Sequence, residues 1–315
     1  MVTEHYLLTT PLNIEFIQKI PMFRKYGVLG IFLILFTQLN FFFKIQPFAN
    51  WYFPLVWFGY ILTIDAIIYK IKRHSLISNR FHDFINLLLL SSLFWWFFEF
   101  INVATGNWNY INAVNNKLYN NLIGDITFIA MLKATISFST VLPAIVETAH
   151  LIRLTHWFDK AKLKKHHKIT KTLLNTMFAL GIISLILPFI FPHYAFPLVW
   201  ISLFFLLDPI NYLHKQPSII SHLKDGKLKI PFSLVAAGMV CGFFWEFWNY
   251  FAITKWTYSI PYVGFFKIFE MPILGYLGYG PFALELYAMY HFIGTLHKEE
   301  KKISHTLTIN SKLKT

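Results

Sequence analysis

The feature that most constrains this chain is a series of apolar runs, each long enough to cross a membrane. A transmembrane helix takes about 20 consecutive, predominantly apolar residues. Only 14% of the 315 residues are charged and 56% are hydrophobic, whereas about a quarter of a soluble domain is charged. We therefore expect an all-α integral membrane protein and not a soluble helical bundle. Eight spans are expected, at about 26–43, 51–69, 84–103, 136–152, 176–191, 195–213, 231–253 and in a last run that ends near residue 293.

The basic residues predict which helix ends face the cytoplasm. Eight spans would place both tails on one side of the membrane, together with the loops near 70–83, 153–172 and 214–230. These segments carry 23 of the 28 Lys and Arg residues. Cytoplasmic loops are enriched in Lys and Arg, so we expect both termini inside a cell (inner) membrane. Since the basic residues fall in these short loops, the net charge of +13 indicates orientation in a lipid bilayer and not a nucleic-acid partner.

An internal repeat divides the chain into two units. Residues 48–69 align without gaps to 191–212, and nine of the 22 positions are identical, including all of Phe-Pro-Leu-Val-Trp. Four spans in each unit return the chain to the same side, so the units are expected to be parallel, related by an axis along the membrane normal. The predicted order is an N-terminal cytoplasmic or interfacial segment (1–25), repeat 1 (26–153), a basic linker (154–168), repeat 2 (169–296) and a cytoplasmic tail (297–315).

The strongest candidate site is a motif found near the end of the third span of each repeat. A Glu and an Asn lie three residues apart, which places both on one face of a helix, and Trp-x-Tyr follows. We predict that the Glu and Asn residues act as acid/base groups and that the aromatic residues bind substrate. The aromatic residues could instead be anchors at the membrane interface, and the Glu–Asn pairs could be structural. The copies are Glu99, Asn102, Trp108 and Tyr110, and Glu246, Asn249, Trp256 and Tyr258.

A second polar layer is expected nearer the cytoplasm. An acid at the centre of a spanning helix costs roughly 2.5–3.5 kcal/mol, so intramembrane acids face a bundle interior or a wet cavity. Each repeat carries an Asp four residues before a Tyr, and a Glu in its last span. They are candidate substrate-binding residues, although the Asp carboxylates could instead accept a hydroxyl hydrogen bond that locks helices together. The layer comprises Asp65, Tyr69, Glu147, Asp208, Tyr212 and Glu285.

The sequence predicts no metal site and no cofactor. Glu147 and His150 have the Glu-x-x-His spacing of di-iron bundles, but the second repeat has Ala288 where the first has His150. Most other histidines lie in basic loops, and the chain has no glycine-rich phosphate loop, nucleophile elbow or zinc motif.

The spacing of the first motif resembles that of the heterodimeric-type lycopene cyclase domain, in which an acid precedes Trp-x-Tyr by nine or ten residues. Glu99 precedes Trp108 by nine residues and Glu246 precedes Trp256 by ten. The similarity covers about the second half of each repeat. It departs from the family at the Pro-x-Glu-Glu pair, for which the nearest string is Pro281-Phe-Ala-Leu-Glu285. The chain also resembles uncharacterised bacterial membrane proteins with Phe-Pro-Leu-Val-Trp and Glu-x-x-Asn repeats.

The resemblance implies an intramembrane enzyme that acts on an isoprenoid or another lipid. A carboxylic acid buried in an apolar site can stay protonated and act as a general acid toward an alkene. Aromatic faces would then stabilise the carbocation, and no cofactor is required. Two alternatives remain open: a proton- or cation-coupled carrier with its site between the repeats, and a structural membrane protein.

Overall fold

The computed structural model describes residues 23–111, 128–164 and 168–312, and the side chains of the last helix as far as residue 296. In this part of the chain, seven helical stretches are long and apolar enough to cross a membrane, which agrees with the predicted all-α, multi-pass membrane class. They are α1 (Lys25–Phe43), α2 (Tyr52–Lys72), α4 (Phe81–Thr105), α5 with α6 (Phe128–Phe138 and Val141–Leu154), α7 (Lys171–Ile190), α8 to α9 (Pro192–Ala195 and Val199–Leu213) and α11 (Lys229–Phe251).

The longest helix, α12 (Tyr279–Lys312), is not among those seven, because its first half interleaves Tyr, His and Glu with apolar residues. It nevertheless contains the last predicted span. The remaining elements are short: α3 (Leu76–Asn79), α10 (Ile219–Lys224), the 3-10 turns η2 (Phe196–Leu198) and η3 (Ile273–Gly278), and the strands β1 (Trp108–Ile111), β2 (Lys255–Tyr258), β3 (Lys267–Ile268) and β4 (Met271–Pro272).

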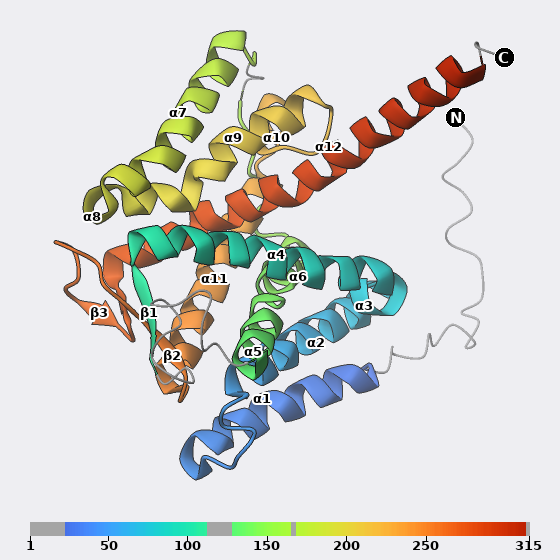
Figure 1. Cartoon of the computed structure of the whole chain (residues 1–315). Coiled ribbons are helices and arrows are strands. Elements are labelled where there is room, and N and C mark those ends of the chain that lie inside the picture. Colours follow the sequence, from blue (N-terminus) through green and yellow to red (C-terminus); the bar gives the residue numbers. More distant parts are fainter. Residues whose placement is uncertain (1–22, 112–127, 165–167, 313–315) are drawn as a thin grey trace, which may run out of the picture.

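The long helices run between two ends of the molecule (Figure 1). One, here called the strand end, carries β1 to β4; the other, the loop end, carries α3 and α10. Ahead of α12, the chain forms the β3–β4 hairpin and η3. Ahead of α6, the described chain resumes with α5 at Phe128; residues 1–22 of the predicted N-terminal segment lie outside the described ranges.

The fourth span is interrupted between α5 and α6. The hydroxyl groups of Ser139 and Thr140 donate to backbone carbonyls one turn earlier, at 2.7 Å each, and such bonds compete with the helix ladder. Ser91 on α4 compensates, since its Oγ donates to Phe138 O at 2.6 Å and accepts from Leu142 N at 2.9 Å. The break is therefore satisfied inside the protein, as a membrane interior requires.

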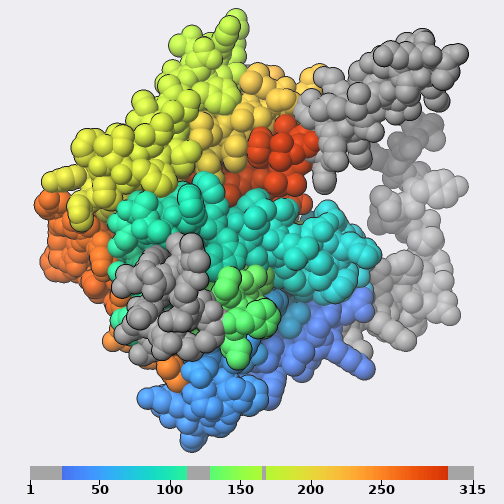
Figure 2. All heavy atoms as spheres, in the orientation of Figure 1, coloured from blue at the N-terminus to red at the C-terminus, as the bar shows by residue number. Residues whose placement is uncertain are grey.

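The helices α1 and α7 lie on opposite sides of the molecule (Figures 1 and 2). Both expose large apolar side chains: Phe32 on α1 is 59% exposed, and Ile190 on α7 is 58% exposed. Contiguous apolar surfaces of this kind are unfavourable in water and suit contact with hydrocarbon. Small residues let α1 approach α2 closely, because a Cβ at Gly30 would lie 2.7 Å from Gly59 O.

Aromatic rings join the N-terminal half to the C-terminal half. Trp57 on α2 is fully buried, and its ring centroid lies 5.3 Å from that of Trp245 and 4.9 Å from that of Trp248, both on α11. In addition, α6 packs against α11 and α4 against α12. The two halves therefore share one core, which extends to the strand end.

Candidate ligand cavity and its carboxylates

The two Trp-x-Tyr segments pair with each other. β1 and β2 are antiparallel, with Trp108 opposite Tyr258 and Tyr110 opposite Trp256. The sequence indicated that these residues lie beyond the helices but did not predict strands. The pairing brings the aromatic residues of both motif copies into one place at the strand end.

The two asparagines hold the strands in position. Asn102 Nδ2 donates to Trp108 O at 2.9 Å, and Asn249 Nδ2 donates to Trp256 O at 2.8 Å. Their Oδ1 atoms accept from backbone N–H groups at Asn107 and Trp256. Both side chains thus clamp the turn that follows the helix, so the geometry favours positioning over the acid/base role predicted for them.

Each glutamate accepts hydrogen bonds from the aromatic residues of its own motif copy. Tyr110 donates to Glu99 Oε1 at 2.6 Å, where the indole N–H of Trp108 also donates, at 3.1 Å. Tyr258 donates to Glu246 Oε1 at 2.7 Å. The Glu, Trp and Tyr residues predicted as one layer therefore form one hydrogen-bonded group in each half.

The second group differs from the first at one backbone position. In the N-terminal half, Trp95, four residues before Glu99, donates its indole N–H to Glu99 Oε1 at 2.9 Å. The residue four before Glu246 is Gly242, and a Cβ there would lie 2.2 Å from the ring of Tyr279. Because Gly242 has no side chain, Tyr279 fits against α11 and donates to Glu246 Oε1 at 2.5 Å. Glu246 thus has two phenol donors.

The second carboxyl oxygen of Glu246, Oε2, has no hydrogen-bond partner among the described residues. Glu246 itself is fully buried. Its partner Tyr258 also accepts from Trp256 Nε1 at 2.7 Å. Burial, and after it the Glu246 carboxylate, raises the pKa of Tyr258 well above its usual range. Tyr258 therefore stays a neutral phenol that donates a hydrogen bond.

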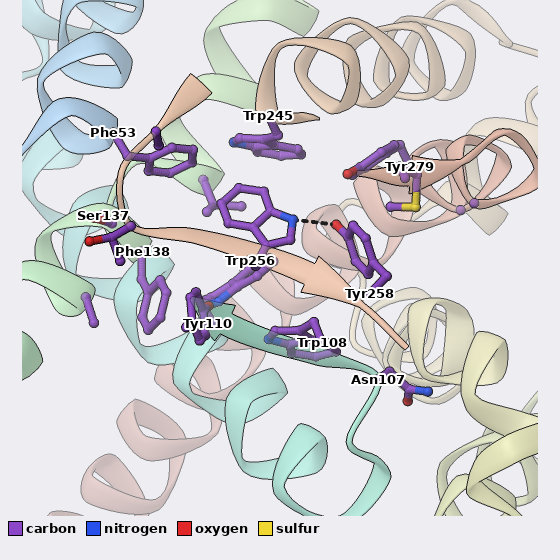
Figure 3. Close-up of a pocket in the computed structure, with 18 of the residues that line it drawn as sticks. Phe53, Asn107, Trp108, Tyr110, Ser137, Phe138, Trp245, Trp256, Tyr258 and Tyr279 are labelled. Atoms are coloured by element: carbon purple, nitrogen blue, oxygen red, sulfur yellow. Dashed lines mark hydrogen bonds between the residues drawn. The ribbon is translucent and has the colours of Figure 1, made fainter. Parts of the chain in front are cut away.

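A cavity of about 330 Å³ opens at the strand end between the two halves. Figure 3 shows the rings of Trp245, Trp256, Tyr258 and Tyr279 gathered around one space, with the Trp256–Tyr258 hydrogen bond at its centre. The carboxylates of Glu99 and Glu246 do not line this cavity; they lie behind the phenols and indoles that do. Its aromatic wall includes Trp95, Trp108, Tyr110, Trp200, Trp245, Trp256, Tyr258 and Tyr279.

The predicted second layer lies elsewhere. Asp65 accepts from Ile77 N at 2.9 Å and from Ser75 Oγ at 2.8 Å, at the start of α3. Asp208 accepts from Ile219 N at 2.7 Å and Ile220 N at 2.9 Å, at the start of α10. Each carboxylate therefore accepts from the backbone at the start of the short helix that follows its span, Asp65 from one N–H group and Asp208 from two, where negative charge is favourable.

The tyrosines of that layer do not bond to its aspartates. Asp65 does accept a hydroxyl hydrogen bond, as the structural alternative expected, but the donor is Tyr26, at 2.5 Å. Tyr69 instead stacks under the Arg24 guanidinium, 3.8 Å from its ring centroid, and Tyr212 has the Lys224 ammonium 5.6 Å away.

The two glutamates of the layer have different neighbours. Glu285 is buried and its Oε1 accepts from Leu203 N of α9 at 2.7 Å. Glu147 is buried on α6 near Asp65 and Arg153. Neither lines the strand-end cavity.

Several cavity residues were missed by the sequence analysis, above all Tyr279, Trp95 and Lys133. Gly242 offered a signal for Tyr279, because a glycine stands where the first motif has a tryptophan. Among the described residues, no three His, Cys, Asp or Glu side chains come together so that they could hold a metal ion. Comparisons with protein-family models, with curated proteins and with solved structures give no match to this chain.

Proposed function

We propose that this chain binds an isoprenoid-like or other lipid molecule in the strand-end cavity and acts on it as an acid/base enzyme. One observation carries the proposal: an aromatic cavity between the halves is walled by both Trp-x-Tyr segments, and a buried carboxylate is hydrogen-bonded behind each. Apolar pockets with a few convergent polar groups are the usual form of small-molecule sites.

The geometry favours proton transfer through tyrosine and not directly from glutamate. Tyr258 and Tyr279 line the cavity, and both donate to Glu246 Oε1. For the transfer, one tyrosine hydroxyl would turn from Glu246 Oε1 toward an alkene carbon of the ligand, and an acid proton on Glu246 Oε1 would pass to that tyrosine oxygen as the tyrosine protonates the carbon. The indole faces of Trp245 and Trp256 would stabilise the carbocation. Return of a proton from a neighbouring carbon to the same pair completes an isomerisation or cyclisation without any cofactor.

The finer architecture belongs to the same proposal: eight spans, in two parallel four-helix repeats, with α12 as the eighth. Equivalent residues of the two halves make equivalent contacts, as Asn102 and Asn249 do with their Trp carbonyls and Asp65 and Asp208 do with α3 and α10. The β1–β2 register also maps onto itself when the two motif copies are exchanged. These correspondences support a twofold axis near Asn109.

Reporter fusions test this topology and its orientation in the membrane. Fusions after residues 75, 160, 220 and 300 are expected to read cytoplasmic, because the basic loops lie there. Fusions after 115, 194 and 259 are expected to read external. A clear reversal between two neighbouring sites would contradict the eight-span order and the parallel repeats with it.

Mass spectrometry of lipids from cells with and without this protein tests the function. An enzyme is expected to add a new lipid product and to deplete its precursor, and neither change is expected in empty-vector cells at matched membrane yield. A lipid that co-purifies with the protein and is chemically unaltered would favour the carrier. Unchanged extracts, together with purified protein that carries no lipid, would contradict both and leave a structural role.

A further inference from the structure

One wall of the strand-end cavity carries a lysine that has no acidic partner among the described residues. Lys133 lies on α5, half-buried, and lines the cavity beside Ser137 of the next turn. Its Nζ donates to Thr254 Oγ1, in the turn between α11 and β2, at 3.1 Å. No carboxylate in the described part of the chain forms an ion pair with it. The nearby strand lysine, Lys255, is different, since it pairs with Glu270 at 2.5 Å.

Once a ligand excludes water from the cavity, an ammonium in this position is costly unless something pairs with it. The cavity is lined mostly by aromatic and aliphatic side chains, and burial of a charge without a partner is strongly unfavourable. A single hydroxyl, that of Thr254, satisfies only one of the three donors of an ammonium group. A pure hydrocarbon in the cavity would remove water from Lys133 and supply no hydrogen-bond acceptor in its place.

An anionic group on the ligand would offset that cost. Charge-assisted hydrogen bonds from an ammonium to a carboxylate or phosphate oxygen are short and roughly twice as strong as neutral ones. Two further side chains at the cavity wall, Asn50 and Asn107, supply polar atoms. The aromatic remainder of the wall suits an apolar tail. The cavity therefore has the two kinds of surface that one amphiphile presents.

We propose that the cavity binds an amphiphile with an anionic headgroup, a carboxylate or a phosphate, which pairs with Lys133 while the apolar tail lies against the aromatic wall. This inference rests on the proposed function, since it specifies the ligand class of the same cavity. It places the charged end of the ligand at α5 and the turn after α11, and it leaves the tail for Trp256, Tyr258 and Tyr279.

Quenching of tryptophan fluorescence by brominated lipids measures this preference. The full-length protein, in nanodiscs of neutral lipid, is titrated with a dibrominated fatty acid, with its methyl ester, and with an alkyl phosphate of similar chain length carrying the same bromines. We expect the wild type to bind an anionic probe at least 10-fold more tightly than the ester, which corresponds to about 1.4 kcal/mol. The anionic probe that binds more tightly, the carboxylate or the phosphate, identifies the preferred headgroup.

The variant Lys133→Met keeps an unbranched side chain of similar length and removes the charge. It is expected to lose the preference: the anionic probe binds roughly 10-fold more weakly and the ester as before. Lys133→Arg should retain the preference, and so should the control Lys267→Met, which removes an exposed lysine at the same end of the molecule. Thermal unfolding of all three variants shows that each is folded.

The outcomes separate this inference from the proposed function. If the ester and the anions bind equally well to the wild type, or if Lys133→Met keeps the preference, the role of Lys133 is overturned while the cavity remains a lipid site. If no probe quenches the wild-type fluorescence, the cavity is not a lipid site and both proposals fail.

Discussion

The substitution Glu246→Gln is expected to lower the activity of this protein by roughly 10²-fold or more, the scale of a lost general acid. A glutamine keeps a carbonyl oxygen where Tyr258 and Tyr279 donate their hydroxyl protons, so most of the local hydrogen bonding survives. It has no acidic proton to pass to them. The effect should therefore fall on catalysis, with little change in thermal stability or in binding of an unreactive lipid.

Glu99→Gln is the matched variant in the other half, and its effect is expected to be milder. Among the described residues, the donors to Glu99 are one phenol, that of Tyr110, and two indoles, which donate hydrogen bonds but are not proton relays. Glu246 has two phenol donors. The measurement is product formation by both variants at equal expression and equal melting temperature. If both retain near wild-type activity, the two glutamates are scaffold, and the acidic group must be sought among Asp65, Glu147, Asp208 and Glu285.

The seven long apolar helices could be predicted because hydropathy marks them directly in the sequence. The third was expected at 84–103 and is α4, Phe81–Thr105; the seventh was expected at 231–253 and is α11, Lys229–Phe251. The ends differ by a few residues because capping and side-chain hydrogen bonds decide where a helix stops. The break between α5 and α6 was not visible, since it depends on Ser91 of another helix.

The candidate site could be predicted as a set of residues but not as an arrangement. The repeated spacing indicated that Glu99 and Tyr110, and Glu246 and Tyr258, belong together, and local chain geometry is enough to join them. The pairing of β1 with β2 joins segments almost 150 residues apart, and no local pattern encodes such a contact. Tyr279 likewise depends on the missing side chain of Gly242.

The second polar layer shows that structural hydrogen bonds can offset the cost of an intramembrane acid. The prediction rested on the cost of an acid within a span. For Asp65 and Asp208, that cost is offset by backbone N–H groups of the helices that follow, at distances of 2.7–2.9 Å. Those donors come from a loop segment whose fold the sequence did not reveal. A buried acid must therefore be judged by its partners as well as by its depth.

The substitution Ala134→Trp is expected to abolish ligand binding by filling the cavity. Ala134 lies on α5 and lines the cavity next to Lys133, so an indole there would occupy the space of the ligand tail. Overpacking of a preformed cavity typically costs about 1–3 kcal/mol, which a stable fold can tolerate. Leu132→Trp is the matched control, because it adds the same side chain to the same helix at a position that is 41% exposed.

Native mass spectrometry of the purified protein tests the central claim, that the cavity between the two halves is a lipid site. The wild type and Leu132→Trp are expected to retain one bound amphiphile of defined mass, and Ala134→Trp, folded to the same melting temperature, is expected to retain none. The claim is contradicted if Ala134→Trp keeps the same ligand at the same occupancy, or if the wild type carries no bound amphiphile.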